Sequence, residues 1–177
     1  MIRTTIKQGE DIAMKQIQLE AVLASHNLWL ATNGKQGLCA KLTNINLRGV
    51  SLSGAILIGA DLSSTNLIGA DLTDADLTSA DLSYADLGTA KLLRAKLIGA
   101  NLEAARLSRA NLDYADLTKA DLSYTYLNGL DLSCTNLTLA NLEGANLTNV
   151  AANYTLLAAT NLEQAHISKI SIFSTDY

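Results

Sequence analysis

The residues in this sequence best suited to chemistry are two histidines, His26 and His166. Neither has a carboxylate or cysteine at the spacing that a metal ion or an acid–base pair requires. We also find no glycine-rich phosphate loop and no nucleophile motif. The sequence therefore predicts no catalytic, cofactor-binding or metal-binding residue, and it predicts that the protein is not an enzyme.

The acidic residues belong to a sequence repeat rather than to a cluster of catalytic or metal-binding residues. A leucine occupies every fifth position from Leu42 to Leu147, twenty-two in succession, and Asp or Asn often comes directly before it. A small residue, usually alanine, comes two positions before the leucine, as in Ala60-Asp61-Leu62. The element that positions the carboxylates is thus a five-residue unit.

A period of five fits neither regular element. On an α-helix, each step of five advances about 140° beyond a full turn, so the leucines would spiral around every face. On a flat strand, an odd step sends successive leucines to opposite faces and leaves half of them in water. The pattern is satisfied if each small residue and leucine point inward, the residue between them points outward, and the chain then turns a corner. We therefore expect a chain that coils around its own leucines.

These units resemble the pentapeptide repeat family over about residues 40 to 176. The resemblance implies an all-β solenoid, a right-handed quadrilateral β-helix in which four pentapeptides make one coil. On that fold the chain makes about seven coils, and the rod is roughly 33 Å long at the spacing of paired strands. Thr125 and Leu130 depart from the small inward residue, and Tyr126 replaces the outward acid. We expect these departures to have modest effects.

Residues 1–39 lack the repeat. The apolar residues Ile17, Ala21, Ala24 and Leu28 have the spacing of one helical face, and Asn33-Gly34 supplies a stop. We expect a helix from about Asp11 to Trp29 that lies across the open end of the first coil as a cap, with Trp29 and Leu30 covering the first leucines. The expected organisation is an N-terminal helical cap, 1–39, and a β-helix, 40–177, in one structural domain.

Composition limits the partners and the compartment. The net charge of −4 offers no basic patch, so we expect no direct binding to nucleic acid. No apolar run is long enough to span a membrane. Cys39 and Cys134 would lie about 23 Å apart on this fold, beyond the ~7 Å that a disulfide bridges. Free thiols, and a stretch from Met1 to Met14 without a signal-peptide core, predict a cytoplasmic protein.

Stacking residues twenty positions apart reveals a charge asymmetry. The face centred on Leu42, Leu62 and Leu82 carries six carboxylates against the single Lys41. We call these residues the acidic strip, and we consider them a possible partner surface: Asp61, Asp81, Glu103, Asp121, Glu143 and Glu163. The alternative is that they form only a solvated face. Tyr84 and Tyr124, on the same face, could flank a groove or pack over the neighbouring coils.

The C-terminal end has no evident cap. The repeat loosens after Leu147, and Leu156 and Phe173 point outward by the register. We predict that these two residues belong to the contact of a homodimer formed through the C-terminal coil. In the competing interpretation, Ser174 to Tyr177 fold over the last coil and Phe173 plugs the end within one chain.

Three classes of function follow. The first is a non-enzymatic protein-interaction or scaffold module with an unidentified protein partner, because a rod with regularly decorated faces has no cleft for chemistry. The resemblance leaves its biological role unassigned, since most members of the family have none. The alternative is a DNA-mimicking modulator or protector of a type II topoisomerase such as gyrase, as some members of the family are. An enzyme is the third class, and no cofactor is expected.

Overall fold

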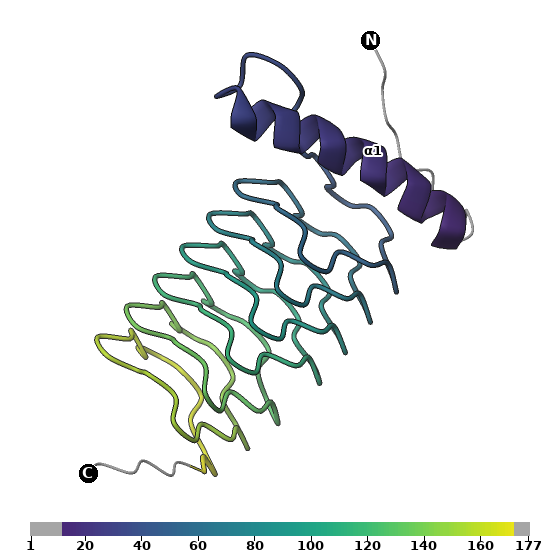
Figure 1. The fold of residues 1–177 in the computed structure, drawn as a ribbon. Coiled ribbons are helices and arrows are strands. Elements are labelled where there is room, and N and C mark those ends of the chain that lie inside the picture. The colour runs from purple at the N-terminus through teal and green to yellow at the C-terminus, as the bar shows by residue number, and fades with distance from the viewer. Residues whose placement is uncertain (1–11, 172–177) are drawn as a thin grey trace.

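The computed structural model describes residues 12–171. Asp11, where the expected helix begins, and Phe173, half of the expected dimer contact, lie outside the described residues. No helix in the described region is long and apolar enough to cross a membrane. Residues 12–171 form one helix, α1, which spans Ile12–Ala31, followed by a solenoid whose coils stack in register (Figure 1).

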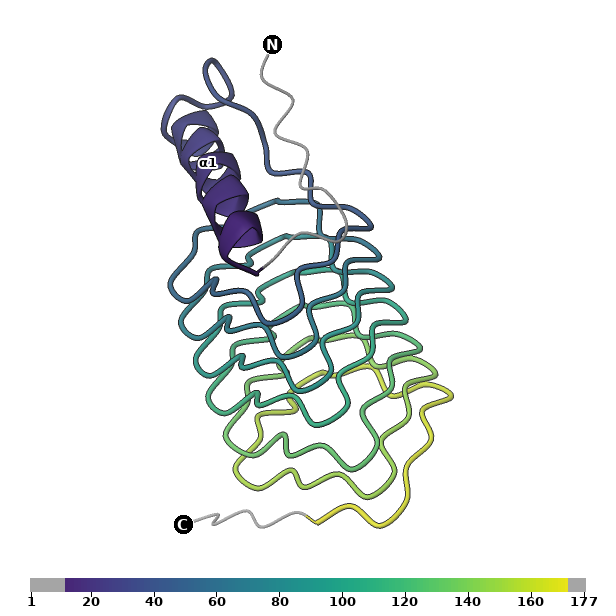
Figure 2. The ribbon, with the colours of Figure 1, turned by 90° about the vertical axis from the view of Figure 1, so that its right-hand side faces the viewer.

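The coils are joined by parallel bridges between residues twenty positions apart. The series begins with Lys41↔Asp61, continues at every fifth residue, and ends with Ala151↔Ser171. Each coil therefore has four sides, and each side is extended over so few residues that it contributes an isolated bridge rather than a longer strand. Figure 2 shows the sides of successive coils lying parallel along the molecule. The expected all-β solenoid with a quadrilateral coil is confirmed.

We number the sides of the coil in chain order by their central leucines. Side 1 contains Leu42 and every twentieth residue after it, and sides 2, 3 and 4 begin in the same way with Leu47, Leu52 and Leu57. All twenty-two leucines of the row are buried, and so are the small residues two positions before most of them. The expected inward placement of both positions is thus correct.

Threonine enters this core with a hydrogen-bond partner. Thr65, Thr125 and Thr135 stand in the small inward position and are fully buried. Each hydroxyl donates to a leucine carbonyl, with Oγ–O distances of 2.5 Å for Thr65, 2.6 Å for Thr125 and 2.6 Å for Thr135. Because a buried hydroxyl without a partner costs free energy, these bonds explain why the core accepts threonine.

The corners of the coil require an unusual backbone conformation. The second residue after each central leucine has a positive φ, as in Asn44 (57°), Ser64 (57°) and Tyr84 (60°). The amide of the next residue then donates back to the leucine carbonyl, for example from Ala85 to Leu82 at 3.0 Å. A left-handed conformation costs a non-glycine residue about 1–2 kcal/mol, so the stacked coils must stabilise each corner against that cost.

Helix α1 lies across the N-terminal end of the solenoid (Figure 1), but it faces the first coil with a different side from the one we expected. Ile17 and Leu28 are 63% and 44% exposed, and Ala21 and Ala24 are exposed as well. The buried side consists of Leu19, Val22 and His26. Apolar residues occur around most of this helix, so their spacing alone did not identify the side that packs.

Specific polar contacts hold α1 in this orientation. The side-chain amide of Gln16 donates to the Ser51 carbonyl and accepts from the Ser51 amide, both at 3.0 Å. The Ser25 hydroxyl accepts from the Leu38 amide at 3.0 Å. The helix is followed by a turn through Gly34, which has a φ of 81°. Trp29 is half-buried, and its ring stacks on that of His26 with the ring centroids 5.7 Å apart. Trp29 therefore has a structural role at the N-terminal end of the solenoid.

The C-terminal end differs from the N-terminal one. Leu157, Leu162 and Ile167 continue the inward register but are 39%, 39% and 50% exposed. They line an apolar cavity of about 170 Å³ in the mouth of the core, together with residues of the preceding coils such as Leu142 and Val150. The core is therefore open at this end of the described chain.

Candidate functional site

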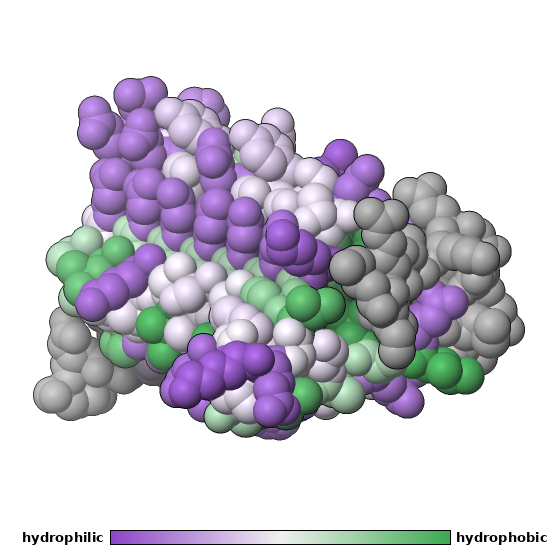
Figure 3. Space-filling model, turned by 90° about the horizontal axis from the view of Figure 1, so that it is seen from above, coloured by the Kyte–Doolittle hydropathy of each residue, from purple (hydrophilic) through white to green (hydrophobic). Residues whose placement is uncertain are grey.

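Side 1 brings the acidic strip together in two parallel columns. Asp61, Asp81 and Asp121 stand directly before their central leucines, in a column joined by bridges from coil to coil. The three glutamates stand directly after their leucines, and they form the neighbouring column: Glu103, Glu143 and Glu163. Figure 3 shows hydrophilic side chains gathered in long rows on the molecule, with paler and more hydrophobic surface beside them.

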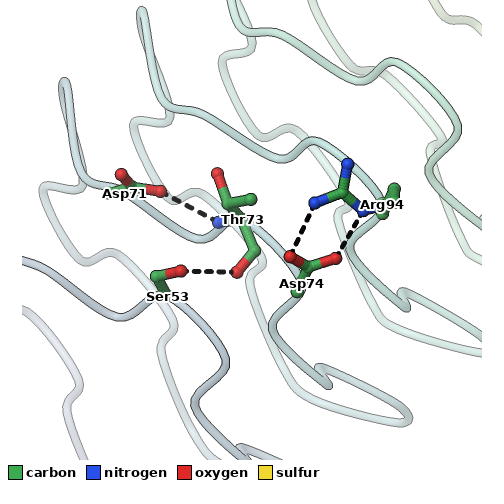
Figure 4. Close-up of polar contacts among 5 residues, drawn as sticks. All are labelled: Ser53, Asp71, Thr73, Asp74 and Arg94. Carbon is green, nitrogen blue, oxygen red and sulfur yellow. Dashed lines mark hydrogen bonds and ion pairs between the residues drawn. The ribbon is translucent and has the colours of Figure 1, made fainter.

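The aspartates of the strip have a structural role. One carboxylate oxygen accepts the backbone amide two residues further on, at 3.1 Å for Asp61 and 2.9 Å for both Asp81 and Asp121. Asp71 on side 3 makes the same contact with Thr73, at 3.1 Å (Figure 4). This Asx contact satisfies an amide at the corner that has no other acceptor in the coil. The frequent Asp or Asn before each leucine is explained by this contact on every side.

Asparagines continue the aspartate column without adding charge. The Asn101 side-chain amide donates to the Asp81 carboxylate at 3.3 Å, and the Asn141 amide donates to Asp121 at 3.2 Å. Asn101 separates the Asp81 and Asp121 carboxylates and replaces repulsion with a hydrogen bond, whereas Asp61 and Asp81 are direct neighbours. The aspartate column is thus a stable ladder of side chains.

Two of the three glutamates accept a hydrogen bond from a tyrosine hydroxyl. The Tyr84 hydroxyl donates to Glu103 at 3.5 Å, and the Tyr124 hydroxyl donates to Glu143 at 3.2 Å. The bond to Glu143 and the surrounding carboxylates raise the pKa of Tyr124. The ring of Tyr124 also lies over Gly144 in the next coil, since a Cβ there would come within 2.6 Å of it. Tyr124 therefore packs over the neighbouring coil instead of standing free beside a groove.

Four carboxylates on the other sides form ion pairs with basic residues of the next coil. Asp74 forms a bidentate pair with Arg94, at 2.6 and 2.7 Å (Figure 4). Three further pairs join residues twenty positions apart in the same way, at 3.4 to 4.0 Å: Lys91–Asp71, Lys96–Asp76 and Arg106–Asp86. Within the described residues, no member of the acidic strip forms an ion pair. On the other sides, Asp113, Asp116 and Asp131 are the described carboxylates without an ion pair. The strip therefore differs in that all six of its carboxylates are unpaired.

The pKa of Asp61 is lowered despite partial burial. Burial alone would raise it, but hydrogen bonds from Ser63 and Thr43 and the nearby Lys41 ammonium favour the charged form. Side-chain and backbone bonds from Thr73 lower the pKa of Asp71 in a similar way, with a contribution from Lys91. These carboxylates are charged at neutral pH, so they present charge to a partner rather than exchange protons with a substrate.

The remaining reactive residues do not gather into a site. Cys39 and Cys134 are both free thiols, as predicted. His26 is fully buried on the side of α1 that faces the solenoid, and its Nδ1 accepts the Ala40 amide at 3.1 Å. Across the described part of the chain, no group of three His, Cys, Asp or Glu residues is placed to hold a metal ion.

The expected C-terminal contact is only partly described. Leu156 lies on the outer surface and is 58% exposed, whereas Phe173 falls outside the described residues. The apolar mouth next to Leu156 was not singled out from the sequence. Leu157, Leu162 and Ile167 line it, and the signal that could have identified them is that they continue the inward register where stacking coils end.

Comparisons with known proteins agree with the repeat. The family model for pentapeptide repeats matches in eight copies over residues 39–67, 55–92, 90–123 and 110–149. The solved structure of HetL, a pentapeptide repeat protein involved in heterocyst differentiation regulation in the cyanobacterium Nostoc, is 26% identical, with a TM-score of 0.32. That match covers 81% of this chain and 94% of HetL.

Two further solved structures are similar. A pentapeptide repeat protein from the cyanobacterium Cyanothece is 24% identical with a TM-score of 0.36, and the match covers 88% of this chain and 96% of that one. QnrB1, a plasmid-mediated fluoroquinolone resistance protein, is 18% identical with a TM-score of 0.31, over 77% of this chain and 91% of that one. A comparison with curated proteins gives no match.

Proposed function

Since this chain belongs to the pentapeptide repeat family, we propose that it is a non-enzymatic scaffold that binds a partner protein along side 1 of its solenoid. One observation carries this proposal. Four of the seven described carboxylates on the other sides pair with basic residues of the next coil, as Asp74 does with Arg94, whereas none of the six in the acidic strip has an ion pair in the described region. Charge that the fold leaves uncompensated is available to a partner.

The partner that fits this surface presents lysine or arginine side chains in a row. Glu103 and Glu143 stand two coils apart, about 9.6 Å at the spacing of paired strands. Rim charges of this kind chiefly raise the association rate and weaken with added salt. We expect binding that is fast and sensitive to ionic strength.

Residues 1–39 are proposed to be the cap of this scaffold, and residues 40–177 its body of about seven coils. The family fold is a right-handed quadrilateral β-helix, and such a solenoid requires its ends to be covered. Burial of Leu19 and Val22 against the first coil and the paired bonds between Gln16 and Ser51 support this division.

The test is partner capture from the source cell with a charge-reversed variant. Glu103→Lys/Glu143→Lys/Glu163→Lys leaves every Asx contact of the aspartates intact, so the fold should be unchanged by circular dichroism. Asp113→Lys reverses a carboxylate at the same repeat position on side 3 and is the matched control. We expect the triple variant to lose the partner and the control to retain it. Retention by the triple variant would refute the proposed surface.

A second candidate function is that of a DNA-mimicking modulator of a type II topoisomerase. The uncompensated carboxylates of the acidic strip favour it, because a row of fixed negative charge resembles a phosphate backbone. Purified protein at micromolar concentration should then inhibit supercoiling by gyrase, and the triple glutamate variant should not. Unchanged supercoiling across that range would eliminate this candidate.

We also propose that two chains associate through the C-terminal coil. The apolar mouth lined by Leu157, Leu162 and Ile167 supports this, because exposed apolar surface of this kind favours a covered state. Light scattering at micromolar concentration should give twice the monomer mass, and Leu162→Asp should give the monomer mass. A wild-type monomer would favour the self-plugged end, whose residues Phe173 to Tyr177 lie outside the described chain.

A further inference from the structure

Side 3 of the solenoid has a regular backbone ladder in its first coils. The Leu92 amide donates to the Asn111 carbonyl at 2.7 Å, and the Arg94 amide donates to the Asp113 carbonyl at 2.9 Å. The return bond runs from the Asn111 amide to the Ala90 carbonyl at 2.9 Å. Each side of the first coils is held in this way by three backbone hydrogen bonds.

One coil later the ladder on side 3 is interrupted. The bridge that would join Asn111 to Asp131 is missing from an otherwise continuous series within residues 41–171. The amides of Leu112, Tyr114 and Asp131, which occupy the same repeat positions as the donors one coil earlier, donate to no backbone carbonyl of the described chain. All three inter-coil bonds of this side are absent here.

The ladder resumes in the following coil. The Leu132 amide donates to the Ala151 carbonyl and the Cys134 amide to the Asn153 carbonyl, both at 2.8 Å. The return bond from Ala151 to Leu130 measures 3.1 Å. The interruption is therefore confined to the interface between two successive coils, residues 101–120 and residues 121–140.

The backbone hydrogen-bond distances around this interface show that the two coils separate unevenly, and we call this uneven separation the wedge. On side 1, Leu102 donates to Asp121 at 2.7 Å. On side 2, Leu107 donates to Tyr126 at 3.4 Å, and the Arg109 amide has no backbone acceptor in the described residues. A surface pocket lies at this margin, lined by Arg106, Ser108, Tyr126 and Asn128. On side 4 the coils are closely paired as well, with Leu117 donating to Asn136 at 2.8 Å. The coils are therefore paired on sides 1 and 4, weakly paired on side 2 and separated on side 3.

Leu130 explains the position of the wedge. The small inward position of this column is alanine in the three preceding coils, Ala70, Ala90 and Ala110, and it is leucine at Leu130. Leu130 is 2% exposed, so its larger side chain is accommodated within the core. Extra volume in a closely packed core displaces the backbone, and the amide that loses its bond to Ala110 belongs to the next residue, Asp131.

We propose that this wedge is a hinge that divides the solenoid into two cooperative units, one ending with residues 101–120 and the other beginning with residues 121–140. Stability in a solenoid is a sum of coil and interface contributions, so the interface with the fewest bonds is the one that opens first. The hinge closes on sides 1 and 4, where the inter-coil bonds are complete. Opening on side 3 tilts Glu103 in one unit relative to Glu143 in the other.

This tilt would let the acidic strip follow the curvature of its partner, a consequence that rests on the proposed function. The hinge itself does not rest on it. If the strip binds nothing, the difference between the two units remains measurable in the free protein.

Amide hydrogen exchange, resolved by residue with NMR, tests the hinge in the wild-type chain. Leu112 and Tyr114 should exchange at least about tenfold faster than Leu92 and Arg94 on the coil before. The amide of Leu132, one coil later, should also exchange slowly. Equal amide exchange rates in these three successive coils of side 3 would overturn the proposal.

Substitution of Leu130 tests its cause. Leu130→Val places in this column the residue found at Val50 and Val150, where the ladder is intact. We expect exchange at Leu112 to slow by at least about tenfold in this variant. Val150→Ala removes volume from the same column one coil later and should leave exchange at Leu112 unchanged.

A folded Leu130→Val protein in which Leu112 still exchanges rapidly would refute Leu130 as the cause. Leu130→Ala is the second variant and carries the same expectation. If neither variant folds, the comparison of the three coils in the wild-type chain still decides whether the hinge exists.

Discussion

The two ends of the solenoid present the same core to different surroundings. Leu42 and Leu162 occupy the same repeat position on side 1, yet Leu42 is fully buried beneath α1 and Leu162 is 39% exposed. The difference comes from what lies beyond each coil, since the local sequence pattern is the same. A leucine in this fold is stabilised by the layer stacked on it as much as by its own coil.

Truncating the two leucines should give the largest effect and the clearest contrast. Leu42→Ala removes a fully buried side chain, so we expect it to reduce the free energy of unfolding by about 2–5 kcal/mol. Leu162→Ala removes a side chain that already contacts water, and we expect a loss of less than about 1.5 kcal/mol. Urea denaturation of both variants measures the difference. Equal losses would mean that the C-terminal end is as well covered as the N-terminal one.

Acid should loosen the covered end before the rest of the solenoid. Burial lowers the pKa of His26, and a backbone contact with Ile58 opposes this lowering only in part. The Nδ1 atom must also stay unprotonated, because it accepts a hydrogen bond from the Ala40 amide. The unfolded chain therefore binds the proton more readily than the folded one. The contribution of neutral His26 is fully present above the ordinary pKa near 6.5 and is lost as the pH falls towards the folded value, by up to about 1.4 kcal/mol per pH unit.

Exchange of the α1 amides between pH 7 and pH 5 measures this loss, after correction for the intrinsic pH dependence of exchange. His26→Gln is the control, because an amide oxygen can accept the Ala40 bond and does not titrate in this range. Its α1 protection should be independent of pH. A wild-type α1 that is equally protected at both pH values would contradict the role of His26.

Loss of Gln16 should have a smaller effect at the same end. Gln16→Ala removes two hydrogen bonds to Ser51, which we expect to cost about 1–3 kcal/mol in the stability of α1. Glu20→Ala, an exposed position on the same helix, should change stability by less than about 0.5 kcal/mol. Thermal unfolding followed at the helix signal compares the two, and equal effects would remove Gln16 from the capping contact.

The smallest effect is expected in the middle of the rod, away from both ends. Arg94→Ala breaks the pair with Asp74, but both side chains are about half exposed. Exposed pairs contribute less than about 1 kcal/mol, and added salt reduces this further. Denaturation at low and high salt should show a small loss that disappears at high salt. A large loss that persists at high salt would show that Arg94 stabilises the coils through contacts other than this exposed ion pair.

The core was predictable because its signal is repeated. A period of five with small residues and leucines permits one inward register, and the structure has Ala60 and Leu62 in it. The ion pairs could also have been predicted from the sequence, because Asp74 and Arg94 are twenty positions apart and bear opposite charges. Once the coil length is known, any such column can be checked from the sequence.

The packing side of α1 and the wedge were harder to predict from the sequence, for physical reasons. α1 is apolar on several sides, and the side that packs includes His26, a residue whose burial depends on one hydrogen bond to Ala40. The effect of Leu130 depends on whether the neighbouring coils can absorb its volume, which no pattern within its own pentapeptide reports. Our expectation of a modest effect at Leu130 did not anticipate the interrupted ladder beside it.

The uniform separation of about twenty residues between bridged positions also bears on how the chain folds. Most β-proteins must bring together segments that are far apart in sequence, which makes them slow to fold. Here each new coil pairs only with the one made just before it, so the contact order is low for an all-β protein. During synthesis, α1 and the first coils leave the ribosome first and can serve as a template on which each later coil assembles as it emerges.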